Sequence, residues 1–177
     1  MKKAILLIMI LVSFCCNISA QTHLTFMGIP ITGTRKAMVT KLKAKGFTEK
    51  IQENDVGVEL KGKYFGKDVR LCVYNSNITK TVYLIDIFFK KGYFMNLYEQ
   101  DLDFREKFNG IYGKPTEILD ESFEETLEFG KLPMCATYYE SSKGLISLEI
   151  SEDKHCVEIS FQDKRNAEIM RKEKPQK

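Results

Sequence analysis

Residues 81–89 constrain the fold most, because their apolar side chains would occupy both faces of a strand. Successive side chains of an extended chain point to opposite sides. One face would carry Ile85, Ile87 and Phe89, and the other would carry Val82, Leu84 and Phe88. Strands of this kind lie in the middle of a sheet and are covered on both sides. We therefore expect residues 81–89 to form a central strand.

Two stretches with helical spacing flank this strand. The first begins after Thr34, a residue type favoured at helix N-caps, and ends at Gly46, which precedes Phe47 as in a glycine C-cap. The second covers residues 94–112, has one broad apolar face and ends before Gly113. We expect one helix in each stretch.

Strand patterns fill much of the remaining chain. They cover residues 56–60 and 69–74 before the central strand, and parts of 116–129, 134–140, 145–150 and 155–162 after the second helix. Short polar turns separate the last three, which is typical of an antiparallel meander. Residues 116–129 also fit one helical face, so strand and helix both stay open there. These separate runs predict an α+β fold, with two helix-plus-antiparallel-sheet units in tandem that share one sheet or core.

The start of the chain has the pattern of a secretory signal peptide. Lys2 and Lys3 precede an apolar run that ends at Cys16, and the small residue Ala20 closes the segment. The apolar run is shorter than the roughly 20 residues that a membrane span needs.

The resulting division of the chain has four parts. We expect a signal peptide at 1–20, a first helix and β-meander unit at 21–91, a second at 92–162 and a polar basic tail at 163–177. The protein would then be periplasmic or secreted, without a stable membrane span. Its oligomeric state stays open.

Three cysteines follow the predicted signal peptide, at Cys72, Cys135 and Cys156. The expected meander register pairs Val157 with Ile150, which places Cys135 on the core face and Cys156 on the other face. One strand would separate these two cysteines by about 10 Å, beyond the ~7 Å that a disulfide tolerates. We expect no bond between them.

The sequence offers little catalytic chemistry. It contains no zinc-ligand spacing and no nucleophile, phosphate-loop or dinucleotide motif. His155 adjoins Cys156, but neighbouring strand residues point to opposite faces. His23 would be third in the exported chain, where ends are commonly mobile. We therefore predict no catalytic residue, no metal site and no cofactor.

One charged pair is a candidate for binding. Asp101 and Arg105 lie four residues apart, inside the apolar stripe of the second helix. Charged residues rarely face a core unless they are paired. They either pair with each other at the margin of the helix–sheet contact, or Arg105 lines a cleft and meets an anionic group of a ligand.

Four further residues are binding candidates by type. Tyr138 and Tyr139 belong to an aromatic-rich strand, and tyrosine is favoured at recognition surfaces, although strand preference explains aromatic residues equally well. Lys41 and Lys45 flank the apolar stripe of the first helix.

Charge divides the chain unevenly. Residues 24–91 hold 13 basic and 6 acidic side chains, whereas residues 92–162 hold 6 basic and 15 acidic ones. The small net charge of +3 therefore results from a basic first half and an acidic second half, which we expect to give the molecule an electric dipole. Such a dipole could hold the two halves together, orient a partner or keep the protein soluble.

Several turn and cap motifs resemble those of small exported Gram-negative proteins of uncharacterised function. The motifs lie at 28–34 (GIPITGT), 42–47 (LKAKGF), 60–66 (LKGKYFG) and 112–115 (YGKP). The helix-plus-sheet unit is similar to the beta-lactamase-inhibitor-like fold and to the SmpA/OmlA lipoproteins of the outer-membrane barrel-assembly machinery. The resemblance implies export and this fold, and it carries no binding residue over to this chain. The inhibitor fold has two short helices per repeat. The lipoproteins have a lipidated cysteine, and Cys15 and Cys16 lie where one could be, but neither follows the small residue that this signal favours.

We expect an exported, non-enzymatic binding or interaction protein. An open sheet face or the cleft between the units would hold a protein or ligand, and nucleic acid is not the expected partner. The alternatives are an envelope structural or assembly factor that contacts membrane proteins, and a hydrolase with an unrecognised site.

Overall fold

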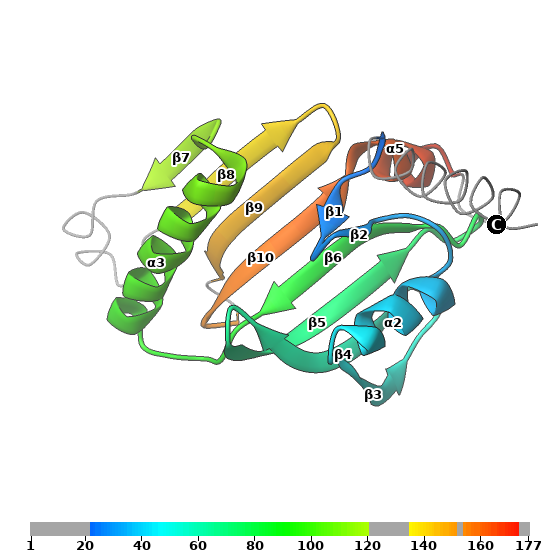
Figure 1. The fold of residues 1–177 in the computed structure, drawn as a ribbon, viewed down its shortest axis with the longest axis horizontal. Coiled ribbons are helices and arrows are strands. Elements are labelled where there is room, and N and C mark those ends of the chain that lie inside the picture. Colours follow the sequence, from blue (N-terminus) through cyan, green and yellow to red (C-terminus); the bar gives the residue numbers. More distant parts are fainter. Residues whose placement is uncertain (1–21, 121–134, 152–153, 174–177) are drawn as a thin grey trace, which may run out of the picture.

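An eight-stranded antiparallel sheet forms the middle of the fold, with strand order β3-β4-β5-β6-β10-β9-β8-β7 (Figure 1). The computed structural model describes residues 22–120, 135–151 and 154–173, so the predicted signal peptide at 1–20 lies outside the described residues. The strands are β3 (Thr48–Glu53), β4 (Gly57–Tyr64), β5 (Lys67–Asn75), β6 (Val82–Phe88), β7 (Glu117–Asp120), β8 (Cys135–Ser141), β9 (Gly144–Ser151) and β10 (Cys156–Asp163).

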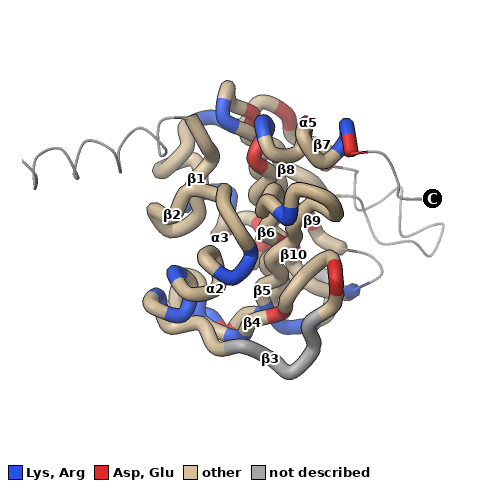
Figure 2. The backbone as a smooth tube through the Cα atoms, turned by 90° about the vertical axis from the view of Figure 1, so that its right-hand side faces the viewer, with Lys and Arg blue, Asp and Glu red and all other residues tan. Residues whose placement is uncertain are grey.

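One face of the sheet carries the helices α2 (Arg35–Ala44) and α3 (Phe94–Tyr112), together with a small ribbon of β1 (Thr25–Phe26) and β2 (Ile29–Pro30). Figure 2 shows these elements as one layer beside the sheet. A third helix, α5 (Lys164–Lys172), lies at one end of the sheet (Figure 1). The predicted α+β class with antiparallel strands is confirmed.

The strand β6 occupies the centre of the sheet, between β5 and β10, as predicted. On the helix-covered face, Ile85 and Ile87 are fully buried. On the other face, which no described helix covers, Phe88 is only 5% exposed because the cations of Arg70 and Lys154 lie 5.3 and 4.1 Å from its ring centroid. On this second face, side chains of neighbouring segments, and not a helix, therefore shield β6 from solvent.

The order helix, then four strands, occurs twice along the chain, as α2 with β3 to β6 and α3 with β7 to β10. The two meanders meet at the pairing of β6 with β10. One hydrophobic core runs through both, from Phe26 and Leu71 to Phe104 and Phe161. The sharing of one sheet and core is observed, whereas the division into tandem units stays a prediction.

The local signals for α2 and the meander are confirmed. The Thr34 hydroxyl accepts a hydrogen bond from the Ala37 N–H, and Gly46 takes a positive φ of 95° after the helix. In the meander, β9 and β10 pair Val157 with Ile150, as expected. None of Cys72, Cys135 and Cys156 is in a disulfide, so Cys135 and Cys156 form no bond with each other.

The structure contains one strand that the sequence did not predict, and it describes only the first part of the segment 116–129. The strand β3 was not expected, because its TEKIQE sequence has little apolar alternation, and it pairs only with β4 at the sheet edge. Within residues 116–129, Glu117–Asp120 is a strand, and residues from 121 onward lie outside the described part of the chain.

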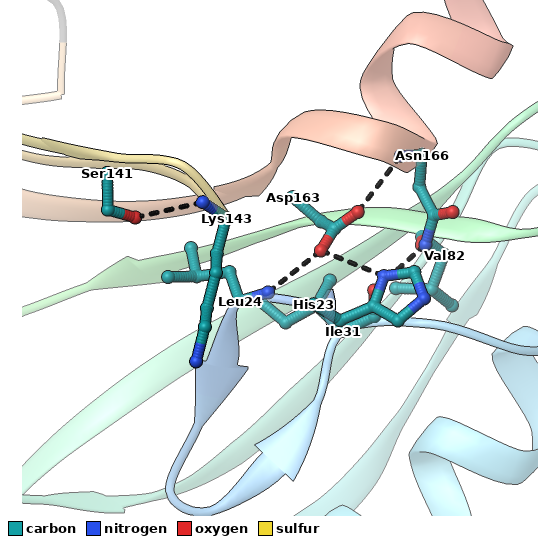
Figure 3. A network of polar contacts seen from close by, with 8 residues as sticks. All are labelled: His23, Leu24, Ile31, Val82, Ser141, Lys143, Asp163 and Asn166. Atoms are coloured by element: carbon teal, nitrogen blue, oxygen red, sulfur yellow. Dashed lines mark hydrogen bonds and ion pairs between the residues drawn. The ribbon is translucent and has the colours of Figure 1, made fainter. Parts of the chain in front are cut away.

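The predicted mobility of His23 is wrong, because the side chain is only 8% exposed and its Nδ1 lies 3.0 Å from Asp163 Oδ2 (Figure 3). The same oxygen accepts the Leu24 N–H at 2.8 Å, and Asp163 Oδ1 accepts the Asn166 N–H at 2.9 Å as the N-cap of α5. The predicted polar tail therefore begins as a docked helix. These partners are far apart in sequence, so local composition could not reveal them.

Asp163→Ala tests whether these Asp163 contacts stabilise the fold. The variant loses the N-cap of α5 and two buried polar contacts, so we expect the free energy of unfolding to fall by about 2–4 kcal/mol in urea titrations. Glu168→Ala, on the exposed side of the same helix, is the control and should change it by less than about 0.5 kcal/mol. Equal losses in the two variants would contradict the role of Asp163.

A second prediction concerns pH at the β6–β10 pairing, where the Ser160 hydroxyl donates to Asp86 at 2.7 Å. Burial raises the pKa of Asp86 from 3.8 to about 6, although the Ser160 hydrogen bond acts in the opposite direction. Between these values the folded protein keeps a proton that the unfolded chain releases, so stability falls as the pH rises from about 4 to about 6.

Asp86→Asn removes this titration and keeps an acceptor for Ser160. Relative to the wild type, the variant should be about 2 kcal/mol more stable at neutral pH than at about pH 4, measured as a difference between urea titration curves. A difference that stays constant across this interval would show that Asp86 titrates as it does in the unfolded chain.

Candidate functional site

A groove of about 960 Å³ lies where β4, β5 and β6 approach the end of α2. We call it the basic groove. Its charged lining comprises Lys45, Lys61, Lys63, Arg70, Lys90, Lys91 and Asp68. Its apolar lining includes Val69, Phe88 and Phe89. Figure 2 shows basic positions gathered around α2 and the neighbouring strands.

Strand pairing brings part of this lining together. Lys61 on β4 is the partner of Arg70 on β5, and Arg70 is the partner of Phe88 on β6. Directly paired residues on adjacent strands share a face of the sheet. Lys90 and Lys91 follow β6 immediately, and Lys45 follows α2. Four chain segments therefore contribute cations to one groove.

Within the described part of the chain, few carboxylates neutralise the charges of the basic groove. Six cations face one carboxylate, Asp68, whose oxygen lies 3.9 Å from Lys63 Nζ in a pair that is largely exposed. Arg70 lies 3.7 Å from Glu59. Among the described residues, the exposed ammonium groups of Lys45, Lys61, Lys90 and Lys91 have no ion-pair or hydrogen-bond partner.

This arrangement favours the binding of anions. Ammonium groups attract and donate hydrogen bonds to carboxylate, sulfate or phosphate oxygens, and Arg70 adds a planar guanidinium held over Phe88. In the described part of the chain, no cluster of three or more His, Cys, Asp or Glu side chains is arranged to hold a metal ion.

The predicted site residues fall in separate places. Lys45 lines the basic groove, whereas Lys41 is exposed on α2. Tyr138 is half-buried on the face opposite the helices and lines a smaller hollow with Leu145. Tyr139 points the other way, where its hydroxyl donates to Asn109 Oδ1 at 3.0 Å. The structure does not bring these four together.

Asp101 and Arg105 form an ion-pair cluster with a third residue, Asp120 of β7. Arg105 Nε lies 2.7 Å from Asp101 Oδ2, and its two terminal nitrogens donate to both oxygens of Asp120 at 2.7 and 2.6 Å. Burial raises the pKa of Asp101 to about 7, against the opposing effect of Arg105. Every guanidinium nitrogen thus contacts a carboxylate of this chain, which favours the ion-pair alternative over a ligand site.

Sequence reasoning missed most of the basic groove. The excess of basic residues in 24–91 was the available signal, and it pointed to this half of the molecule. Lys61 and Lys90 lie 29 positions apart in the numbering, and only the pairing of β4, β5 and β6 brings their segments together.

No family model, curated protein or solved structure matches this chain. Among the described residues, no helix is both long enough and apolar enough to cross a membrane.

Arg105→Met tests the structural role of the ion-pair cluster. It leaves the fully buried Asp101 carboxylate without its cation, so we expect the free energy of unfolding to fall by about 3–5 kcal/mol. The double variant Asp101→Leu/Arg105→Met should recover part of this loss, because no unpaired buried charge remains at position 101. Unchanged stability in urea titrations of the single variant would contradict the ion-pair reading.

Proposed function

We propose that this protein is an exported binding protein that holds an anionic ligand or an anionic group of a partner in the basic groove. The observation that carries the proposal is the convergence of six cations from four segments on one groove with a single lining carboxylate. Export rests on the signal-peptide pattern of residues 1–20 and on the resemblance to small exported proteins.

The energetics support a binding role for these lysines. Like charges that are close together repel one another and destabilise the compact state, so their grouping offers the fold no stability of its own. An anion relieves this repulsion, and each ammonium–anion contact in the partly enclosed groove adds a charge-assisted hydrogen bond.

The proposal is tested with inorganic tripolyphosphate as probe, by isothermal titration calorimetry at low salt. Lys61→Gln/Lys90→Gln removes two cations without removing long side chains, so we expect about tenfold weaker binding, equivalent to about 1.4 kcal/mol. Thermal unfolding should be nearly unchanged, because neither ammonium has a partner within the described chain.

Lys114→Gln is the matched control, since Lys114 is exposed and lies outside the groove lining. It makes the same chemical change and should bind the probe within about twofold of the wild type. Wild-type affinity in Lys61→Gln/Lys90→Gln, or equal weakening in the control, would overturn the basic groove as the binding site.

A further inference from the structure

Two exposed apolar side chains follow the basic groove along the chain. Lys90 and Lys91 line the groove, and Tyr93 comes two residues after Lys91. Tyr93 is 87% exposed, the highest value among the large apolar residues of the described chain. Met95, in the first turn of α3, is 55% exposed. Residues 90–95 therefore combine cations with exposed apolar side chains.

This segment lies at the same end of the sheet as the basic groove. The strand β6 ends at Phe88, which pairs with Arg70 of the groove lining. Figure 1 shows the connection from β6 to α3 at the end of the sheet where the turn between β4 and β5 also lies. Consecutive Cα atoms are about 3.8 Å apart, so the Cα atoms of Lys91 and Tyr93 lie within about 8 Å of each other.

The backbone presents the Tyr93 side chain from a fixed support. The Gly92 N–H donates to the His155 carbonyl at 3.1 Å, directly before β10. The Tyr93 carbonyl accepts the Leu97 N–H at 3.1 Å, as the N-cap residue of α3. The backbone on both sides of this side chain is therefore hydrogen-bonded, while the side chain itself extends into solvent.

Tyr93 does little for the helix that it begins. Serine, threonine, aspartate and asparagine are favoured at N-caps, because their side-chain oxygens accept a backbone N–H. The Tyr93 side chain makes no such hydrogen bond, and its exposure shows that it packs little against the described chain. Positions that depart from local preference without a gain in packing commonly serve function. A binding role accounts for an exposed tyrosine at this N-cap.

We propose that the basic groove docks on the surface of an anionic lipid membrane, and that Tyr93 and Met95 enter the interfacial layer beside it. This inference rests on the proposed function, because it identifies the anionic group in the groove as the phosphate of lipid headgroups. The contact is peripheral, and the two apolar side chains reach only the boundary between headgroups and acyl chains.

The segment and the groove together supply the two signals that peripheral attachment needs. The surface of an anionic membrane attracts clustered lysines and arginines over about one Debye length. Tyrosine is enriched at membrane–water interfaces, because its ring is apolar and its hydroxyl stays hydrated. Stable anchoring commonly combines an apolar group with a basic patch, since one signal alone gives weak, reversible binding.

The position of the apolar side chains favours a membrane over a soluble anion. A soluble anion would neutralise the lysines but leave Tyr93 and Met95 in water. The aromatic residues of the groove lining, Phe88 and Phe89, are buried, and the Arg70 guanidinium lies over the Phe88 ring. The accessible apolar surface is therefore beside the groove and not within it, as docking on a membrane requires.

The test measures co-sedimentation with phospholipid vesicles, made of phosphatidylcholine alone or with about one third anionic phosphatidylglycerol. We expect the wild type to bind the anionic vesicles about tenfold more tightly, and Lys61→Gln/Lys90→Gln to lose most of this preference. Tyr93→Ser/Met95→Ser should weaken binding to anionic vesicles about tenfold, because less apolar surface leaves water, and should keep tripolyphosphate affinity within about twofold of the wild type.

Ile111→Ser/Ile118→Ser is the matched control, because both residues are exposed and lie near the opposite end of α3 and on β7. It should bind the vesicles within about twofold of the wild type. All variants share the same N-terminus, identified by intact mass, so residues 1–20 affect them equally. The melting temperature of Tyr93→Ser should not fall, because serine is a favoured N-cap residue, so unfolding does not account for lost binding.

A second measurement reports the environment of position 93 directly. The chain contains no tryptophan, so Tyr93→Trp introduces a single fluorophore. Its emission should shift to shorter wavelength when anionic vesicles are added, because the indole leaves water for the interfacial layer. The emission of Ile111→Trp should not shift.

Four results would overturn the inference. They are the absence of wild-type binding to anionic vesicles, binding that Lys61→Gln/Lys90→Gln does not weaken, wild-type vesicle affinity in Tyr93→Ser/Met95→Ser, and an unshifted emission of Tyr93→Trp on bound vesicles. In each case the proposed function stands if Lys61→Gln/Lys90→Gln still weakens tripolyphosphate binding, and the groove then holds a soluble anion. Absence of both vesicle and tripolyphosphate binding in the wild type would reject the inference and the proposed function together.

Discussion

The pairing of β6 with β10 is the constraint on which the rest of the structure depends. It joins the two meanders from Leu84 and Gln162 to Phe88 and Glu158. On the helix-covered face, the paired residues Ile85 and Phe161 are fully buried, so the same seam that completes the sheet also makes the core continuous. Without it each meander would expose an unpaired edge and half a core.

This seam also fixes the position of the basic groove. Beyond β6, the Phe89 N–H donates to the Val157 carbonyl at 3.0 Å, and the Gly92 N–H donates to the His155 carbonyl at 3.1 Å. Lys90 and Lys91 lie between these two anchors. Their ammonium groups are free in solution, but the backbone that carries them is held against the start of β10.

The elements that sequence reasoning predicts are those governed by neighbours in the chain. Thr34 and Gly46 bound α2 through contacts within a few residues, and the turn between β9 and β10 sets a register that spacing alone predicts. The docking of α5 depends instead on His23, 140 positions from Asp163, and no local pattern reports such a partner. The same limit applied to the site, where Lys45 was a candidate but Lys61 and Lys90 were not.

The ion pairs in the structure show how each half of the molecule accommodates its excess charge. The ion pairs of Lys63 and Arg70 lie within the first half of the molecule, and those of Arg105, Lys107 and Lys154 lie within the second half. These particular ion pairs therefore do not join the two halves. Among the described residues, Arg105, Lys107 and Lys154 of the second half pair with nearby carboxylates, whereas Lys45, Lys61, Lys90 and Lys91 of the first half have no ion-pair partner. Crowding of like charges destabilises a fold on its own, which is the physical ground for the anion-binding role that we propose for the basic groove.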